Sequence, residues 1–259
     1  MIHLIGFPFD GTACFRKGAA SAPDAIRAVM DGLETYSPYL DRDTEDVRVK
    51  DLGNLPCSWE EGTRAFGRVV PEMGKTLLLG GEHSVSFAPI RRALRRYPNL
   101  VVVQLDAHAD LRDGYQGYHH SHASIIRRVL DCFGPGHRLI QAGIRSGTRE
   151  EFAWMREHDT LCPSQAHLLG RVEALAKDRP IYLTVDLDYF DPAFVPGTGT
   201  PEPGGETFQS FVSLCQVLMR KNLVGADVVE LAPIIDPTNN SSVFAAAVVR
   251  ELTLVLDEP

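Results

Sequence analysis

The chain has 259 residues, a formal net charge of −8 at pH 7, 44% hydrophobic residues and 23% charged residues. This size and composition are typical of a soluble globular protein, and we expect one domain over residues 1–259. The acidic balance and the lack of a basic stripe argue against nucleic acid and membrane surfaces as partners, and they are compatible with a cationic ligand. No apolar run approaches the length needed to span a bilayer.

The N-terminal segment Met1-Ile-His-Leu-Ile-Gly6 has neither a basic leader nor a cleavage site, and it is predicted to be the first strand. The five cysteines are scattered along the chain and form no Cys-x-x-Cys pair. This pattern indicates free thiols in a reducing compartment, and we therefore expect a cytoplasmic protein.

Short apolar runs predict the strands, and longer segments predict the helices. The predicted strands span residues 2–6, 47–52, 76–79, 100–105, 139–144, 181–187 and 223–231. The predicted helices span residues 22–31, 59–73, 84–96, 121–130, 149–157, 164–177, 207–221 and 241–255. Because strands and helices alternate, we predict an α/β fold with three α/β/α layers and a mainly parallel central sheet. Ligands bind such sheets beyond the carboxyl ends of the strands.

Polar side chains gather where the predicted strands end. The segment after the fourth predicted strand places Asp106, His108 and Asp110 at alternate positions. Because side chains of an extended segment alternate between two faces, we expect these three groups to point the same way. Asp186 and Asp188 follow the sixth predicted strand in the same manner. So many carboxylates in one pocket require cations to balance them.

Each of these features also has an interpretation without a metal. His83 could cap a helix that begins at Ser84, Glu230 could be a surface carboxylate, and an Asp-x-Asp pair could simply be solvated. Together, however, two histidines and four aspartates without a thiolate suit a hard divalent ion such as Mn²⁺ better than structural zinc. Six ligands fit two ions that share bridging carboxylates, typically ~3.5–4 Å apart.

The order of these motifs along the chain resembles the ureohydrolases, the family of arginase, agmatinase and their relatives. The matching segments are Gly80-Gly-Glu-His-Ser84, Asp106-Ala-His-Ala-Asp110, Ser121-His-Ala123, Asp186-Leu-Asp-Tyr-Phe-Asp-Pro192, Pro196-Gly-Thr-Gly-Thr-Pro-Glu-Pro-Gly-Gly205 and Val229-Glu-Leu-Ala-Pro233. The resemblance extends from Gly6 to about Asp236, nearly the whole chain. It implies an arginase-like three-layer fold and a cofactor of two Mn²⁺ per chain.

The resemblance also implies a set of metal ligands. It places His83, Asp106, Asp110 and Asp186 on one ion, and Asp106, His108, Asp186 and Asp188 on the other. Asp106 and Asp186 would therefore bridge the two ions.

The implied reaction is the hydrolysis of a guanidino group to urea and an amine. A metal pair would lower the pKa of bound water from about 15.7 toward about 7 and so supply hydroxide, which Asp110 could orient. By resemblance His122 matches the catalytic histidine, and it would pass a proton to the leaving amine. Glu230 matches the acid that holds the guanidinium, and Thr200 matches a threonine beside the substrate.

The substrate is predicted to be a small cationic guanidino compound. The segments around Thr200 and His122 look more like those of agmatinases than those of animal arginases, which suggests agmatine, with putrescine and urea as products of a step in polyamine biosynthesis. Residues 111–120 show no obvious groups for an α-amino acid head, and Glu202 and Glu206 are expected to make the rim acidic. Formal charge counting at the site also favours a dication such as agmatine.

The sequence leaves several alternatives open. His119 or His120 could replace His122 as the proton shuttle. The substrate could instead be arginine, another guanidino acid or formiminoglutamate. A deacetylase-like amidohydrolase is a further alternative, but its single ion would leave His83 and Asp110 without a role as metal ligands. A non-catalytic metal-binding relative is another, but it would not need an intact ligand set. The family suggests a homo-oligomer, either a trimer or a hexamer.

Overall fold

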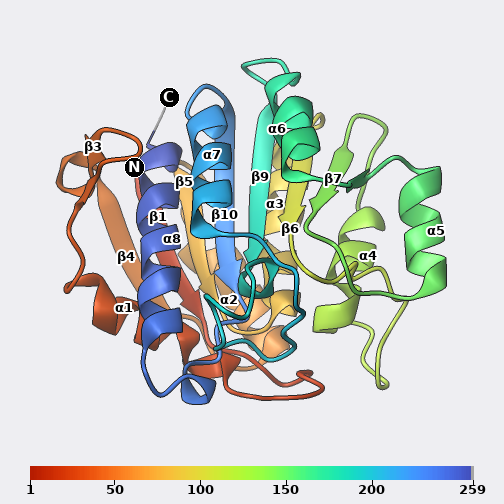
Figure 1. Cartoon of the computed structure of the whole chain (residues 1–259), viewed down its shortest axis with the longest axis horizontal. Coiled ribbons are helices and arrows are strands. Elements are labelled where there is room, and N and C mark those ends of the chain that lie inside the picture. Colours follow the sequence, from red (N-terminus) through yellow and green to blue (C-terminus); the bar gives the residue numbers. More distant parts are fainter. Residues whose placement is uncertain (258–259) are drawn as a thin grey trace.

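The computed structural model describes residues 1–257 and shows a central sheet between two layers of helices (Figure 1). The eight-stranded sheet has the order β4-β1-β5-β10-β9-β6-β7-β8, and all its pairings are parallel. Its strands are β1 (Ile2–Phe7), β4 (Val49–Asn54), β5 (Lys75–Gly80), β6 (Val101–Leu105), β7 (Arg138–Ala142), β8 (Leu161–Cys162), β9 (Pro180–Asp186) and β10 (Asn222–Val229). A separate antiparallel pair consists of β2 (Tyr36–Ser37) and β3 (Arg42–Asp43).

The helices cover both faces of this sheet. One layer contains α1 (Ala22–Met30), α6 (Gln165–Glu173), α7 (Phe208–Leu218) and α8 (Asn240–Leu256), which lie in front of the sheet in Figure 1. The opposite layer contains α2 (Trp59–Val69), α3 (Phe87–Arg96) and α4 (Ile125–Leu130), while α5 (Arg149–Glu157) lies beyond the β7 side of the sheet. The predicted three-layer α/β/α architecture with a parallel central sheet is therefore confirmed.

The central strands are apolar along their whole length because helices cover them on both sides. Every residue of β6 and of β9 is buried, which explains why these strands read as continuous apolar runs instead of alternating patterns. Helices α2, α5, α6 and α7 begin where a serine or threonine side chain accepts a backbone N–H of the first turn. In α5 the pair Thr148 and Glu151 forms a complete capping box.

All seven predicted strands and all eight predicted helices are present, with shifts at their ends. The segments predicted to open two of the helices instead form short 3₁₀ turns, at His83–Ser86 before α3 and at His122–Ser124 before α4. Strands β2, β3 and β8 were not predicted, because two residues are too few to show a periodic pattern.

The topology brings distant parts of the chain to one edge of the sheet. After β5 the chain crosses to β6 and continues outward to β8, and only then do β9 and β10 fill the gap between β6 and β5. The carboxyl ends of β5, β10, β9 and β6 are thus neighbours, at the point where a ligand site is expected in a parallel sheet. Within residues 1–257, no helix combines the length and the apolar character required to cross a membrane.

Candidate active site

The loops that follow β5, β6, β9 and β10 converge on one buried, carboxylate-rich cluster. β6 ends at Leu105, as predicted, and an isolated parallel bridge between His108 and Ser146 follows it. Asp110 has a left-handed backbone with φ of 53°, and its carbonyl oxygen accepts hydrogen bonds from the backbone N–H groups of Ile126 and Arg127. Asp106, His108 and Asp110 all reach the same cluster, as their alternate spacing in the sequence predicts.

The cluster consists of two groups that share one aspartate. His83, Asp106 and Asp110 form the first group, and Asp106, His108 and Asp188 form the second, with ligand atoms within 4.8 Å of one another in each. His83 Nδ1 lies 3.0 Å from Asp106 Oδ2 and 3.2 Å from Asp110 Oδ2. His108 Nδ1 lies 2.9 Å from Asp188 Oδ2.

Asp186 also belongs to this cluster, on the side of the first group. Its Oδ2 atom lies 3.3 Å from His83 Nδ1, and its Oδ1 atom accepts the backbone N–H of Asp188 at 2.9 Å. The structure therefore brings all six predicted ligands together. Asp106 belongs to both groups, whereas Asp186 contacts His83 of the first group.

The donor set fits a cation, and His83 shows why. Thr184 Oγ1 donates its hydrogen to Asp227 Oδ1 at 2.6 Å, so it can only accept from His83 Nε2, which lies 2.8 Å away. The hydrogen of the neutral ring is then on Nε2, and the lone pair of Nδ1 faces three carboxylate oxygens. Among the described residues this buried nitrogen has no hydrogen-bond partner. A metal ion between Nδ1 and the carboxylates would satisfy every one of these groups.

The raised pKa values of the clustered carboxyl groups show that burial and mutual repulsion disfavour their ionised forms. Burial and the charge of Asp106 raise the pKa of Asp110 to about 7. Burial, together with Asp188 and Asp106, raises the pKa of Asp186 well above its usual range, and burial does the same for Glu230. Divalent cations would remove this penalty by holding the carboxylates ionised.

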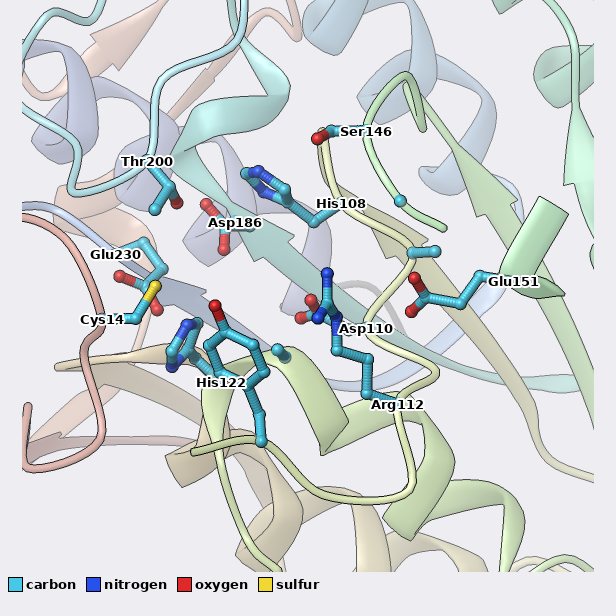
Figure 2. Close-up of a pocket in the computed structure, with 14 residues that line it drawn as sticks. Cys14, His108, Asp110, Arg112, His122, Ser146, Glu151, Asp186, Thr200 and Glu230 are labelled. Carbon is cyan, nitrogen blue, oxygen red and sulfur yellow. The ribbon is translucent and has the colours of Figure 1, made fainter. Parts of the chain in front are cut away.

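An open pocket of about 250 Å³ leads to the cluster. Figure 2 shows Thr200, Glu230 and His122 at one side of this pocket and Arg112 and Glu151 at the other. Thr200, Glu230 and His122, which were predicted from the sequence, therefore all line it, as do the metal-ligand candidates His108, Asp110 and Asp186.

The three neighbouring histidines are separated by the fold. His122 lines the pocket, whereas the His120 ring stacks on Trp59 with 4.1 Å between ring centroids. His119 contacts the guanidinium of Arg128, with 2.6 Å between Nε2 and Nη1. Among the described residues, neither His119 nor His120 lines the pocket.

The acidic rim stays a prediction. In the described part of the chain, Glu202 and Glu206 are not lining residues of the pocket, but Glu202 accepts a hydrogen bond at 2.9 Å from the hydroxyl of Ser146, which does line it. Glu151 supplies the additional acidic group of the wall, and Arg112 supplies a basic one.

Sequence reasoning missed Cys14, Arg112, Tyr115, Ser146 and Glu151 as pocket residues. The capping-box spacing of Thr148 and Glu151 could have placed Glu151 at the start of a helix, but it gives no indication of a pocket. The Arg112 guanidinium lies 4.7 Å from the centre of the Tyr115 ring, and Tyr115 meets the edge of His122 at 5.8 Å between centroids. These three side chains form one continuous wall.

Buried carboxylates and histidines at adjacent strand ends of an α/β/α sheet form a candidate metal site. The sequence model of the arginase family matches residues 1–255. The chain belongs to the arginase family, and it is a ureohydrolase.

Relatives of known name agree with this assignment. An agmatinase of Bacillus anthracis is 39% identical over 269 aligned residues, which cover 98% of this chain and 91% of the relative. An agmatinase of Bacillus subtilis is 38% identical and covers 97% of this chain and 90% of its own length. The crystal structure of an agmatine ureohydrolase of Thermoplasma volcanium superposes with a TM-score of 0.83 at 29% identity, covering 99% of this chain and 90% of that structure.

Proposed function

We propose that the protein binds two Mn²⁺ per chain and hydrolyses agmatine to putrescine and urea. The single observation that carries this proposal is the position of Asp106 in both ligand groups, as a shared ligand of two adjacent ions requires. His83, Asp106, Asp110 and Asp186 would hold one ion, and Asp106, His108, Asp186 and Asp188 the other. When bound, the ions supply hydroxide at neutral pH and polarise the guanidino group.

Glu230 is proposed to bind the guanidinium of the substrate. Its Oε1 atom accepts the backbone N–H of His83 at 2.7 Å, which fixes the carboxylate beside the metal ligands. Its left-handed backbone, with φ of 66°, turns the chain at the end of β10 and directs the side chain into the pocket. A planar guanidinium pairs well with a fixed carboxylate, because its N–H donors match the oxygen lone pairs.

Thr200 supports the opposite side of the same site. Its hydroxyl lies 3.4 Å from Asp188 Oδ2 and lines the pocket. We propose that it contacts the substrate beside the metal ligands and limits where the guanidino carbon can lie.

His122 is proposed to carry the proton to the leaving amine. Burial is the main cause that lowers the pKa of His122, to about 4. The ring is therefore neutral near pH 7, so it can accept a proton and then pass it on. The contacts of His119 and His120 outside the pocket support this choice among the three neighbouring histidines.

A second candidate substrate class, the anionic guanidino acids, is favoured by Arg112. The ions would neutralise the ligand carboxylates and Glu230 would pair with the guanidinium, which leaves Glu151 and Arg112 to meet the rest of the substrate. Glu151 favours a terminal amine such as that of agmatine, whereas Arg112 favours a terminal carboxylate. The names of the relatives given above support agmatine.

The test is a comparison of kcat/KM for the Mn²⁺-loaded protein with agmatine, arginine, 4-guanidinobutyrate and formiminoglutamate, measuring urea or, for the last compound, formamide. Agmatine is expected to be the best substrate. A preference for guanidinobutyrate would replace the agmatine proposal and leave the ureohydrolase class intact. We also propose that the protein is cytoplasmic and, from family resemblance, that it forms a trimer or hexamer. Analytical ultracentrifugation would test the oligomeric state.

A further inference from the structure

Thr12, which is held by the buried Glu82, contacts His122. We propose that Thr12 is a positioning residue that, held by Glu82, fixes the tautomer and orientation of the His122 ring. The inference rests on the proposed function only for the step in which His122 acts. The tautomer itself is a property of the protein without substrate.

Glu82 holds Thr12 through both of its carboxylate oxygens. The Glu82 side chain is fully buried, and Thr12 is 6% exposed. Glu82 Oε2 accepts the backbone N–H of Thr12 at 2.7 Å, and Glu82 Oε1 accepts the Thr12 hydroxyl in a short hydrogen bond. The Ser84 hydroxyl also donates to Glu82 Oε1, at 2.6 Å. Both donors of Thr12 are therefore committed to one buried carboxylate.

The commitment of the Thr12 hydroxyl leaves only its oxygen lone pairs for His122. The backbone N–H of His122 donates to Thr12 Oγ1 at 3.3 Å, and His122 Nδ1 lies 3.5 Å from the same oxygen. Because this oxygen can only accept, a neutral His122 ring is favoured with its hydrogen on Nδ1. The other ring nitrogen, Nε2, then keeps a free lone pair for proton transfer.

Backbone contacts make this arrangement rigid. The loop after β1 lies directly against the loop after β5, since Glu82 N–H donates to the Phe9 carbonyl at 2.7 Å. A Cβ atom on Gly81 would lie 1.9 Å from that Phe9 oxygen, so glycine is required for the two loops to approach this closely. Thr12 and His122 are 110 residues apart in sequence, and the contact exists only because these loops meet at one edge of the sheet.

The test compares Thr12→Val, which keeps the shape and removes the hydroxyl, with Thr12→Ser, which keeps the hydroxyl. We expect Thr12→Val to bind two Mn²⁺ per chain, to keep KM within about threefold, and to lose about 10–100-fold in kcat. Thr12→Ser should stay within about threefold of the wild type in both constants. Thr253→Val is the matched control, because its buried hydroxyl donates to the Val249 carbonyl within α8, outside the pocket.

A spectroscopic measurement separates this inference from the proposed function. The ¹⁵N shifts of His122, assigned with His122→Asn in protein loaded with the diamagnetic ion Zn²⁺, should report hydrogen on Nδ1 in the wild type and a mixture of tautomers in Thr12→Val. Failure of the wild type to release urea would reject the proposed function without changing this result.

Three outcomes would overturn the inference. The first is an unchanged tautomer in Thr12→Val. The second is an equal loss of kcat in Thr12→Ser. The third is a loss of Mn²⁺ from Thr12→Val that is large enough to explain its loss of activity. A drop in the melting temperature of Thr12→Val that Thr253→Val reproduces would mark only a general stability cost, and kcat at a temperature where both variants are folded then decides.

Discussion

Replacement of Asp106 by asparagine should abolish both metal sites at once. Asp106 belongs to both ligand groups, whereas His108 belongs to only one. Asp106→Asn keeps the shape of the side chain but removes the charge that two ions would share. Asp106→Asn is therefore expected to bind no Mn²⁺ at stoichiometric concentrations, and His108→Ala is expected to lose the second site and keep the first.

The expected size of the effect follows from the number of sites. At a free Mn²⁺ concentration of 100 times Kd, each site stabilises the fold by about 2.7 kcal/mol, and two sites together contribute about 5 kcal/mol. For a chain of this size, 1 kcal/mol corresponds to about 2–4 °C in melting temperature, so Mn²⁺ should raise the wild-type value by about 10–20 °C. The rise should be about half as large in His108→Ala and close to zero in Asp106→Asn.

The metal-free variant should itself be less stable than the metal-free wild type. Asp106 Oδ2 accepts the Gln104 Nε2 amide at 2.8 Å, and Oδ1 accepts the His108 backbone N–H at 2.5 Å. An asparagine can satisfy only one of these donors, and its own amide would then face the other. Leaving such a buried donor unpaired costs about 1–3 kcal/mol, so each protein must be compared with its own metal-free form.

Elemental analysis and thermal melts with and without Mn²⁺ would provide the measurement. Asp178→Asn is a matched control, because Asp178 is exposed and the same substitution there should leave both ions bound. If Asp106→Asn still holds one ion at full occupancy, or keeps half of the wild-type rise in melting temperature, the assignment of Asp106 as a bridging ligand is refuted.

Three further substitutions test the pocket. His122→Asn should keep both metals and lose about 10²–10⁴-fold in kcat, while His120→Asn stays within a few-fold; the reverse result would move the proton shuttle to His120. Glu230→Gln should raise KM for agmatine and lower kcat, since the charge both binds and positions the guanidinium; unchanged kinetic constants would exclude that role. Arg112→Gln should raise kcat/KM for agmatine by about 2–5-fold, because a half-buried charge of like sign on the pocket wall opposes the cation by about 1 kcal/mol; a fall would show instead that Arg112 binds the substrate.

The sequence by itself determined the layered fold and the identity of the six metal-ligand candidates. Short continuous apolar runs such as that of β9 favour buried strands, and the alternation of strands with helices leaves few ways to cover them. A polar group directly after such a strand, as at Asp186 and Asp188, must lie at the carboxyl edge of the sheet. These are local signals, and they survive in a single sequence.

Only the tertiary structure decided which groups meet across loops. His83 meets Asp106 and Asp186 only because the carboxyl ends of β5, β6 and β9 lie at one edge of the sheet. The fold also separates His122, which lines the pocket, from His120, whose ring stacks on Trp59.

The sequence also could not predict the residues of the pocket wall or the contact between Thr12 and His122. Arg112 lies in a loop that showed no substrate groups in sequence, and Thr12 reaches His122 across 110 positions. Local sequence patterns indicate the secondary structure of short segments and which of their residues are buried. They cannot report a contact whose two partners are brought together by the order of strands in a sheet, because that order is settled by the packing of the whole chain.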